Sequence, residues 1–162
     1  MSDAVRWAVP DDADALADVH IASWQAAYSG IFSDDYLSGL DLEARRTWWR
    51  NQLEGGARVP VVGTRAAGFC FVGDADDEGW GEVYAIYVHP DRWRKGLGQL
   101  LLGAGMSQLR EIGHQRALLW VLEHNHPARR FYESQGWRVG KPIRVEEIGG
   151  MQVTEVRYEI DL

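Results

Sequence analysis

The segment from residue 90 to residue 99 places basic side chains and two glycines between an expected strand and an expected helix. Its sequence is Pro90-Asp91-Arg92-Trp93-Arg94-Lys95-Gly96-Leu97-Gly98-Gln99. The free N–H groups and the dipole of a helix N-terminus favour a bound anion, and glycine lets the backbone approach phosphate oxygens. The basic side chains add positive potential. The segment therefore predicts a site suited to a pyrophosphate, while a turn that needs glycine only for its backbone angles fits the same residues.

Two other phosphate-binding motifs are absent from this segment. The P-loop pattern G-x-x-x-x-G-K-[ST] does not occur, and the dinucleotide fingerprint G-x-G-x-x-G fails because Leu101 stands three residues after Gly98. The expected anion site therefore belongs to another class.

A second segment further along the chain corroborates the first. It reads Asn125-His126-Pro127-Ala128-Arg129-Arg130-Phe131-Tyr132-Glu133-Ser134-Gln135-Gly136-Trp137. It resembles the N-x-x-A-x-x-F-Y-x-x-x-G-[FW] segment of the GCN5-related N-acetyltransferases. In the first segment, Gly96 and Gly98 match the coenzyme motif of that family, [QR]-x-x-G-x-[GA], while Trp93 stands where the family has Gln or Arg. The resemblance covers essentially the whole chain.

The resemblance implies transfer of an acetyl group from acetyl-CoA to a primary amine of a small molecule or amino acid, by direct attack. It implies that the coenzyme rests on main-chain N–H groups of the segment Arg94, Lys95, Gly96, Leu97, Gly98 and Gln99. It also implies that a main-chain N–H near Tyr87 or Val88 polarises the thioester carbonyl. A protein N-acetyltransferase of the same fold, or a module that binds acyl-CoA without catalysis, remains an alternative.

Two side chains are candidates for moving protons in this reaction. By resemblance, Tyr132 lies near the coenzyme sulfur and acts as the general acid, and a phenol with a pKa near ~10 is protonated at neutral pH. Its alternative is a helix-face aromatic that packs with Phe131. Glu82 stands at the spacing from Gly96 at which some family members carry a glutamate that deprotonates the acceptor. Its alternative is a solvated charge at a strand end.

Further residues are expected at the coenzyme arm and at the acceptor. Asn125 is expected to contact the pantetheine arm or, alternatively, to cap a helix. His20, Trp24 and Tyr28 recur at four-residue spacing on one helix face, and in the family this helix shapes the acceptor site. We therefore expect Trp24, Tyr28 and Glu82 at the acceptor, with core packing as the alternative for Trp24. No metal site is predicted, because the histidines form no recognised ligand spacing.

The elements that must position these residues follow from hydrophobic periodicity and turn residues. We expect strands at 5–9, 58–64, 68–72, 82–88, 117–122, 137–145 and 151–160, the last two joined around Gly149-Gly150. We expect helices from about residue 11 to Gly30, at 42–53 and 97–112, and from Pro127 through Tyr132, ending at Gly136. The order β-α-α-β-β-β-α-β-α-β-β predicts an α/β fold with a mixed, mostly antiparallel central sheet and helices on both faces. Residues 1–162 are expected to form a single domain.

Composition narrows the classes of partner. The net charge of −7 argues against a broad nucleic-acid surface. The single cysteine, Cys70, excludes disulfides within the chain and a Cys-rich metal site. No segment reads as a signal peptide or a bilayer span, so we expect a cytoplasmic protein without membrane contact. Eight tryptophans make a homodimer plausible.

Overall fold

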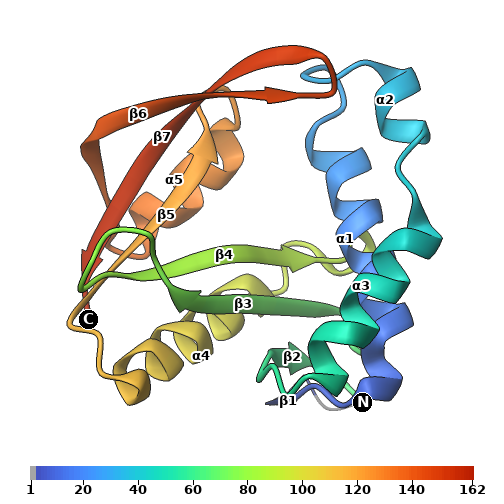
Figure 1. The fold of residues 1–162 in the computed structure, drawn as a ribbon, viewed down its shortest axis with the longest axis horizontal. Helices are drawn as coiled ribbons and strands as arrows, with labels where there is room; N and C mark the ends of the chain where they lie inside the picture. Colours follow the sequence, from blue (N-terminus) through green and yellow to red (C-terminus); the bar gives the residue numbers. More distant parts are fainter. Residues whose placement is uncertain (1–2) are drawn as a thin grey trace.

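The computed structural model describes residues 3–162, and its strands form one seven-stranded sheet (Figure 1). In space the strands follow the order β1-β2-β3-β4-β5-β7-β6. Within the described residues, β4 and β5 are the one parallel pair, and the other neighbours are antiparallel. The strands are β1 (Val5–Trp7), β2 (Pro60–Val62), β3 (Gly68–Asp74), β4 (Gly81–Val88), β5 (Arg116–Leu122), β6 (Arg138–Ile148) and β7 (Met151–Asp161). The predicted mixed, mostly antiparallel sheet is confirmed.

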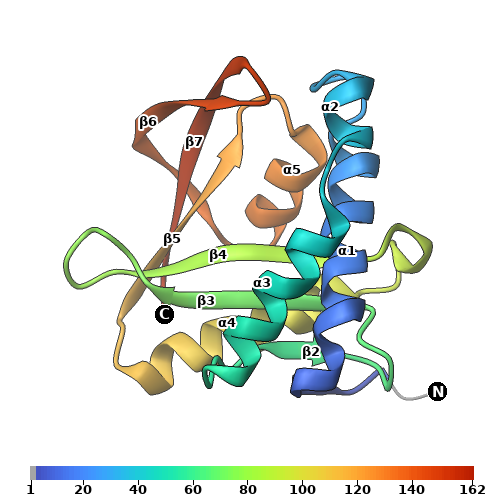
Figure 2. The ribbon, with the colours of Figure 1, turned by 45° about the vertical axis from the view of Figure 1, so that its right-hand side comes forward.

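Helices cover both faces of the sheet, as predicted (Figure 2). One face packs against α1 (Ala13–Ala27) and α3 (Leu42–Glu54), which share a core cluster with β2 and β3. The other face packs against α4 (Leu97–Ile112) and α5 (His126–Ser134). Two 3₁₀ turns, η1 (Pro10–Asp12) and η2 (Pro90–Arg92), precede α1 and α4. No helix in residues 3–162 combines the length and the apolar character that crossing a bilayer requires.

Helix α4 lies close to the sheet because small residues face each other there. A Cβ atom at Gly105 would lie 2.6 Å from the sulfur of Cys70 on β3, so the helix can approach only with glycine at this position. The Cys70 side chain is fully buried, and burial raises the pKa of its thiol to about 12. The chain's one cysteine is therefore a packing residue in its neutral form.

One helix was missing from the predicted order. Helix α2 (Asp34–Ser38) follows α1, and the hydroxyl oxygen of Ser33 accepts a hydrogen bond from the Tyr36 N–H at 3.2 Å. Leu37 is buried in a cluster with Tyr28 and Phe32, which fixes this short helix in place. The Ser33 cap was a local signal, but five residues are too few for a helical period to stand out.

Several predicted boundaries also shift by a few residues. The first strand ends at Trp7 because Val9 is already the N-cap residue of η1, where its N–H donates to the carboxylate of Asp12 at 2.8 Å. The predicted turn between the last two strands is confirmed, since Gly149 and Gly150 have φ angles of 60° and 76°. Paired positive φ values favour glycine and suit the twist of a hairpin.

Candidate active site

The site begins where strands β4 and β5 separate. Their parallel pairing includes Gly81 with Ala117 and Glu82 with Leu118, and no later pair is formed although β4 continues to Val88. Main-chain groups of β4 beyond Glu82 are therefore free of the neighbouring strand on that side. A ligand that enters between the strands can reach them.

A β-bulge in β4 accounts for the separation. Phe71 and Val72 of β3 pair with Ala85 and Val83 of β4, which leaves Tyr84 as an extra residue. A bulge bends its strand and increases the local twist. Because Tyr84 follows Glu82 by two residues, the strand turns away from β5 directly after the last parallel pair.

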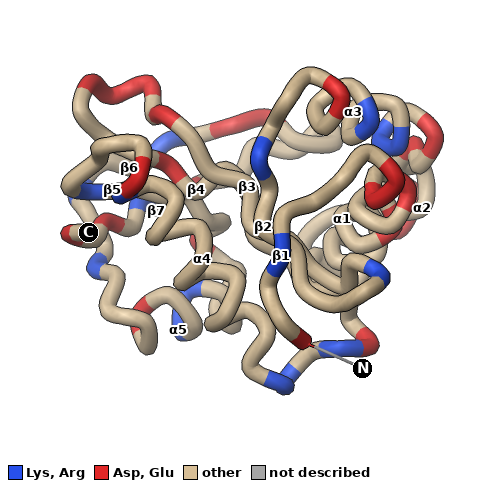
Figure 3. Tube along the Cα trace, turned by 90° about the horizontal axis from the view of Figure 1, so that it is seen from below, with Lys and Arg blue, Asp and Glu red and all other residues tan. Residues whose placement is uncertain are grey.

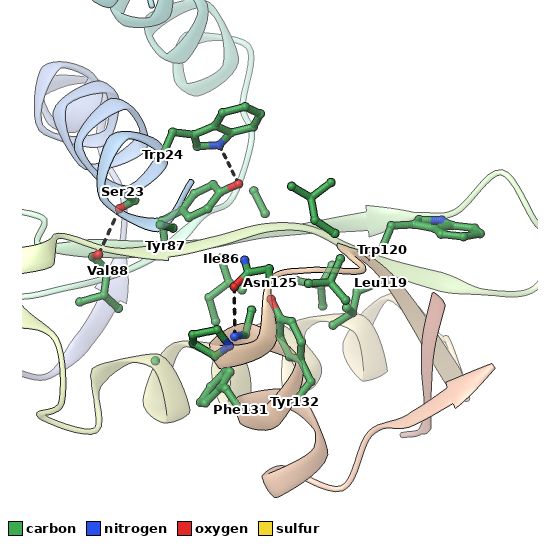
Figure 4. A pocket seen from close by; sticks show the side chains of 18 of the residues that line it. Ser23, Trp24, Ile86, Tyr87, Val88, Leu119, Trp120, Asn125, Phe131 and Tyr132 are labelled. Atoms are coloured by element: carbon green, nitrogen blue, oxygen red, sulfur yellow. Dashed lines mark hydrogen bonds between the residues drawn. The ribbon is translucent and has the colours of Figure 1, made fainter. Parts of the chain in front are cut away.

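A cavity of about 840 Å³ opens at this separation. It is lined from both faces of the sheet: Figure 4 shows Ser23, Trp24 and Tyr87 on one side of β4, and Asn125, Phe131 and Tyr132 on the other. The candidate residues from the sequence that line it are Trp24, Tyr28, Glu82, Tyr87, Val88, Arg94, Gly96, Leu97, Gly98, Gln99, Asn125 and Tyr132. Lys95 is exposed and does not line the cavity. The structure thus brings together residues that lie up to 108 positions apart in the chain.

The loop before α4 has an unusual backbone. Arg94 has a φ of 65° and Gly96, the N-cap residue of α4, has a φ of 77°. Within the described residues, Arg94 is the one non-glycine side chain in this left-handed region, a conformation that is strained for residues with a Cβ. Such residues cluster at functional sites. The loop ends on the free N–H groups of the first turn of α4, beside the cavity.

Trp93 ties this loop to the end of β4. Its indole Nε1 donates a hydrogen bond to the main-chain oxygen of Val88 at 2.7 Å. The hydroxyl of Ser23, on α1, donates to the same oxygen at 3.1 Å. Two side chains from different elements therefore fix the strand end whose N–H groups border the cavity. The sequence did not predict this role for the residue in the first motif position.

Helix α5 positions Tyr132. Asn125 is its N-cap, with the side-chain oxygen accepting from the Ala128 N–H at 3.3 Å. Asn125 therefore caps the helix, as the alternative interpretation held, and it also lines the cavity. The Tyr132 ring packs near Trp137 and Tyr158. Burial raises the pKa of Tyr132 above its usual range. The phenol is therefore protonated at neutral pH and able to donate a proton.

Glu82 is half-buried and belongs to the last parallel pair before β4 and β5 separate. Burial raises the pKa of its carboxyl, the guanidinium of Arg144 lowers it, and the charges of Asp76, Asp77 and Glu155 raise it. Within residues 3–162 no ion pair is formed by this carboxylate. A carboxylate with a raised pKa and no fixed partner is suited to accept a proton.

Aromatic residues at the end of α1 form part of the cavity wall on the sheet face that carries Glu82. The indole Nε1 of Trp24 donates to the hydroxyl of Tyr87 at 2.9 Å, and Trp24 packs against Tyr28 and Phe32. Burial raises the pKa of Tyr28 far above its usual value. Trp24 thus combines the core-packing alternative with a place on the cavity wall.

His20, on the same helix, lies behind this wall. Its ring is near those of Trp24 and Tyr87, it does not line the cavity, and burial lowers its pKa to about 3. It is therefore a neutral packing residue at physiological pH. Among the described residues, no three His, Cys, Asp or Glu side chains are grouped to hold a metal ion.

Sequence reasoning missed several residues of the cavity wall. These side chains come from α1, β4, β5, α5, β6 and β7, and they are Ser23, Tyr84, Trp120, Phe131, Arg144 and Glu155. Strand alternation would have placed some of them on one face. The register between β5, β7 and β6 was needed to bring Trp120, Arg144 and Glu155 to one place.

Comparison with known proteins supports one family. The model of the acetyltransferase (GNAT) family matches residues 15–137. The uncharacterized N-acetyltransferase YuaI of Bacillus subtilis is 33% identical over 160 residues, which cover 94% of this chain and 89% of YuaI.

Solved structures share the fold at lower sequence identity. PaiA N-acetyltransferase of Thermoplasma acidophilum, in complex with coenzyme A, aligns over 100% of both chains with a TM-score of 0.80 and 20% identity. YncA of Salmonella typhimurium, a putative acetyltransferase with its cofactor acetyl-CoA, covers 98% of this chain and 92% of its own, with a TM-score of 0.72 and 22% identity. From the family match and the similarity to YuaI, the chain belongs to the acetyltransferase (GNAT) family and is an N-acetyltransferase of that family.

Proposed function

We propose that this enzyme transfers the acetyl group of acetyl-CoA to a primary amine of a small molecule or amino acid. One observation carries the proposal: a single cavity joins the N-terminus of α4, the protonated phenol of Tyr132 and the carboxylate of Glu82. The similar folds of PaiA and YncA, which hold coenzyme A and acetyl-CoA, support the choice of donor.

The loop before α4 fits the phosphates of the coenzyme. A Cβ at Gly98 would meet only the Phe131 ring, at 3.4 Å, and nothing lies within 4 Å of a Cβ at Gly96. The open space above these glycines lets phosphate oxygens approach main-chain N–H groups between Arg94 and Gln99. The Arg94 side chain adds positive charge there, and Asn125 borders the route of the pantetheine arm along the cavity.

The proposed reaction needs one carbonyl, one amine and two proton transfers. The amine nitrogen attacks the thioester carbonyl carbon, so that a C–N bond forms and the C–S bond breaks. Glu82 accepts the proton that the attacking nitrogen loses, and Tyr132 donates a proton to the departing thiolate. A main-chain N–H near Tyr87 or Val88 stabilises the negative charge on the carbonyl oxygen. Direct attack requires no covalent acetyl-enzyme, and Cys70 is buried away from the cavity.

A thiol-release assay over a panel of amines tests this function, together with the variant Tyr132→Phe. We expect acceptor-dependent release of coenzyme A thiol by the wild type. We expect Tyr132→Phe to lower kcat by about 10²-fold while the affinity for acetyl-CoA is nearly kept, because the proton is needed only in the transition state. Tyr36→Phe is the matched control, since Tyr36 lies outside the cavity lining.

Other outcomes would select the alternatives. Tight binding of acetyl-CoA without thiol release for any amine would favour a binding module. Release only with proteins or peptides would favour a protein N-acetyltransferase. The single domain, the cytoplasmic location and the homodimer stay predictions.

A further inference from the structure

The loop between β3 and β4, residues 75–80, comes directly before Glu82 in the chain. The Ala75 N–H donates to the main-chain oxygen of Trp80 at 2.9 Å, which closes the loop at its base. Its acidic residues are Asp76, Asp77 and Glu78. Figure 3 shows this acidic loop at the end of the molecule where β5, β6 and β7 are labelled. A displacement of the loop would therefore move negative charges relative to Glu82.

Arg157, on β7, holds this loop in place. Its side chain is 8% exposed, and its guanidinium pairs with the carboxylate of Asp77. Its Nε donates to Glu159 at 2.7 Å, and its guanidinium carbon lies 4.6 Å from the centroid of the Trp80 ring. Arg116 lies 4.2 Å from the centroid of the same ring. Because a planar guanidinium can bond carboxylates and stack on an indole at once, Arg157 fixes the loop at two points.

Strand register places Arg157 on the same sheet face as Glu82. Glu82 pairs with Leu118 of β5, and Arg157 pairs with Trp120 of the same strand. Leu118 and Trp120 are two residues apart, so they and their strand partners share one face of the sheet. Arg157 does not line the cavity. Any effect of Arg157 on the reaction must therefore pass through its neighbours.

The charges that act on Glu82 come from the sheet and from the loop. Burial makes the largest contribution to the raised pKa of Glu82, Arg144 lowers this pKa, and Asp76, Asp77 and Glu155 raise it. Arg144 and Glu155 are bonded to each other at 2.9 Å across β6 and β7, so strand pairing sets their positions. The positions of the two loop carboxylates depend instead on what holds the loop.

Asp77 is repelled by its surroundings once Arg157 is removed. Within residues 3–162, Arg157 is the one cation paired with Asp77, whose side chain is 53% exposed. Glu159, bonded to the same guanidinium, and the adjacent Asp76 carry like charge. Without the guanidinium, Coulomb repulsion favours movement of the Asp77 carboxylate outward into solvent. Such a movement takes its charge away from Glu82.

We propose that Arg157 is a positioning residue of this acetyltransferase: it holds loop 75–80 through Asp77 and Trp80, and so keeps the negative charge of the loop beside Glu82. This inference rests on the proposed function, in which Glu82 is the base. A base with a higher pKa takes a proton from the acceptor more readily. The contact between Arg157 and Asp77 therefore supports the reaction from outside the cavity.

The variants Arg157→Met and Asp77→Asn test the proposal through the dependence of kcat/KM on pH. In both, we expect the rise of kcat/KM with pH to move to lower pH by about half a unit, because a charge that raises the pKa of Glu82 is lost or moved away. The double variant should match Asp77→Asn. A rise at higher pH in Arg157→Met, as expected when a cation is lost from an unmoved loop, would overturn the proposal, and so would additive shifts in the double variant.

Two further variants serve as controls. Glu78→Gln makes the same change of charge in the same loop, on an exposed side chain next to Asp77, and should leave the pH profile unchanged. Arg157→Lys keeps the charge but loses the planar group, so its shift should be smaller than that of Arg157→Met. Calorimetry should give the same affinity for acetyl-CoA in all variants. A shift in Glu78→Gln as large as that in Asp77→Asn would refute the specific contact.

Nuclear magnetic resonance separates this inference from the proposed function. The ¹³C carboxyl signal of Glu82, assigned by its absence in Glu82→Gln, reports the pKa of Glu82 without substrates. A lower Glu82 pKa in Arg157→Met and Asp77→Asn supports the role of Arg157, even if the pH–rate profile stays the same, a result that would refute Glu82 as the base. An unchanged Glu82 pKa would refute the role of Arg157. Because Asp77 is half-exposed, Asp77→Asn decides the matter even if Arg157→Met does not fold.

Discussion

At the α4 end of the cavity, one short run of consecutive residues supplies the strained Arg94, the two glycines and the helix N-terminus. At the Glu82 end, four strands each contribute a side chain, from β4, β5, β6 and β7. The first end acts through backbone conformation and main-chain N–H groups. The second acts through side chains whose charges depend on their neighbours.

This difference predicts which measured property a substitution at each end of the cavity should alter. A change at the α4 end should alter donor binding for all acceptors alike, because the same backbone atoms serve every reaction. A change at the Glu82 end should alter pH dependence and acceptor choice while donor affinity is kept. Each prediction below tests whether the two ends separate in this way.

The largest effect is expected for Gly98→Trp. Gly98 lines the cavity in the first turn of α4, and an indole there would occupy the space proposed for the phosphates. We expect calorimetry to show a loss of acetyl-CoA affinity of about 10²-fold or more, on the scale of several lost phosphate contacts. Gly103→Trp is the control, because Gly103 is exposed on the same helix with nothing within 4 Å of its Cβ position. Equal acetyl-CoA affinity in both variants would refute the assignment of this loop to the coenzyme phosphates.

An intermediate effect is expected for Glu82→Gln. The pKa of Glu82 is raised, so the rise of kcat/KM with pH should lie above the range of an ordinary glutamate in the wild type. This rise with pH should be absent in the variant. Its kcat/KM near neutral pH should be about 10²-fold lower, while its affinity for acetyl-CoA is kept. An identical pH–rate profile would retire Glu82 as the base.

Stability against pH gives a second measurement on Glu82. A carboxyl whose pKa is raised by folding stabilises the protein while protonated, and this contribution is lost as pH rises through the folded pKa. Glu82→Gln should therefore unfold at a higher temperature than the wild type near pH 7, and the difference should shrink near pH 4. A difference that does not change with pH would show that the Glu82 pKa is not raised.

The smallest effect is expected for Trp93→Phe, which removes the hydrogen bond to the Val88 oxygen and keeps a large ring. A net loss of about 0.5–1.5 kcal/mol corresponds to about two- to tenfold weaker binding of acetyl-CoA. The KM for the amine should change little if the loop serves only the donor. Trp48→Phe on α3 is the control, since Trp48 is exposed and outside the cavity. A larger change in the amine KM than in donor affinity would break the separation between the two ends.

Much of the fold followed from the sequence because its signals are local. Helix α4 was predicted with its observed bounds, since apolar residues at helical spacing end at Gly113, which has a φ of 114°. The turn at Gly149 and Gly150 was also predicted from a local signal, because two consecutive glycines between strands are typical of a hairpin turn. Helix α2 was missed because it is short and depends on packing against Tyr28 and Phe32.

By itself, the sequence determined the strands, the longer helices, the glycine turn before α4 and the family, because each is carried by residues close together in the chain. Only the tertiary structure decided that Tyr84 is the extra residue of the bulge where β4 separates from β5. It also decided the hydrogen bond from the Trp93 indole to the Val88 main-chain oxygen. It also decided that Arg144 is held by Glu155 beside Glu82. Strand register sets these contacts, and register depends on pairing between distant segments that a local pattern does not encode.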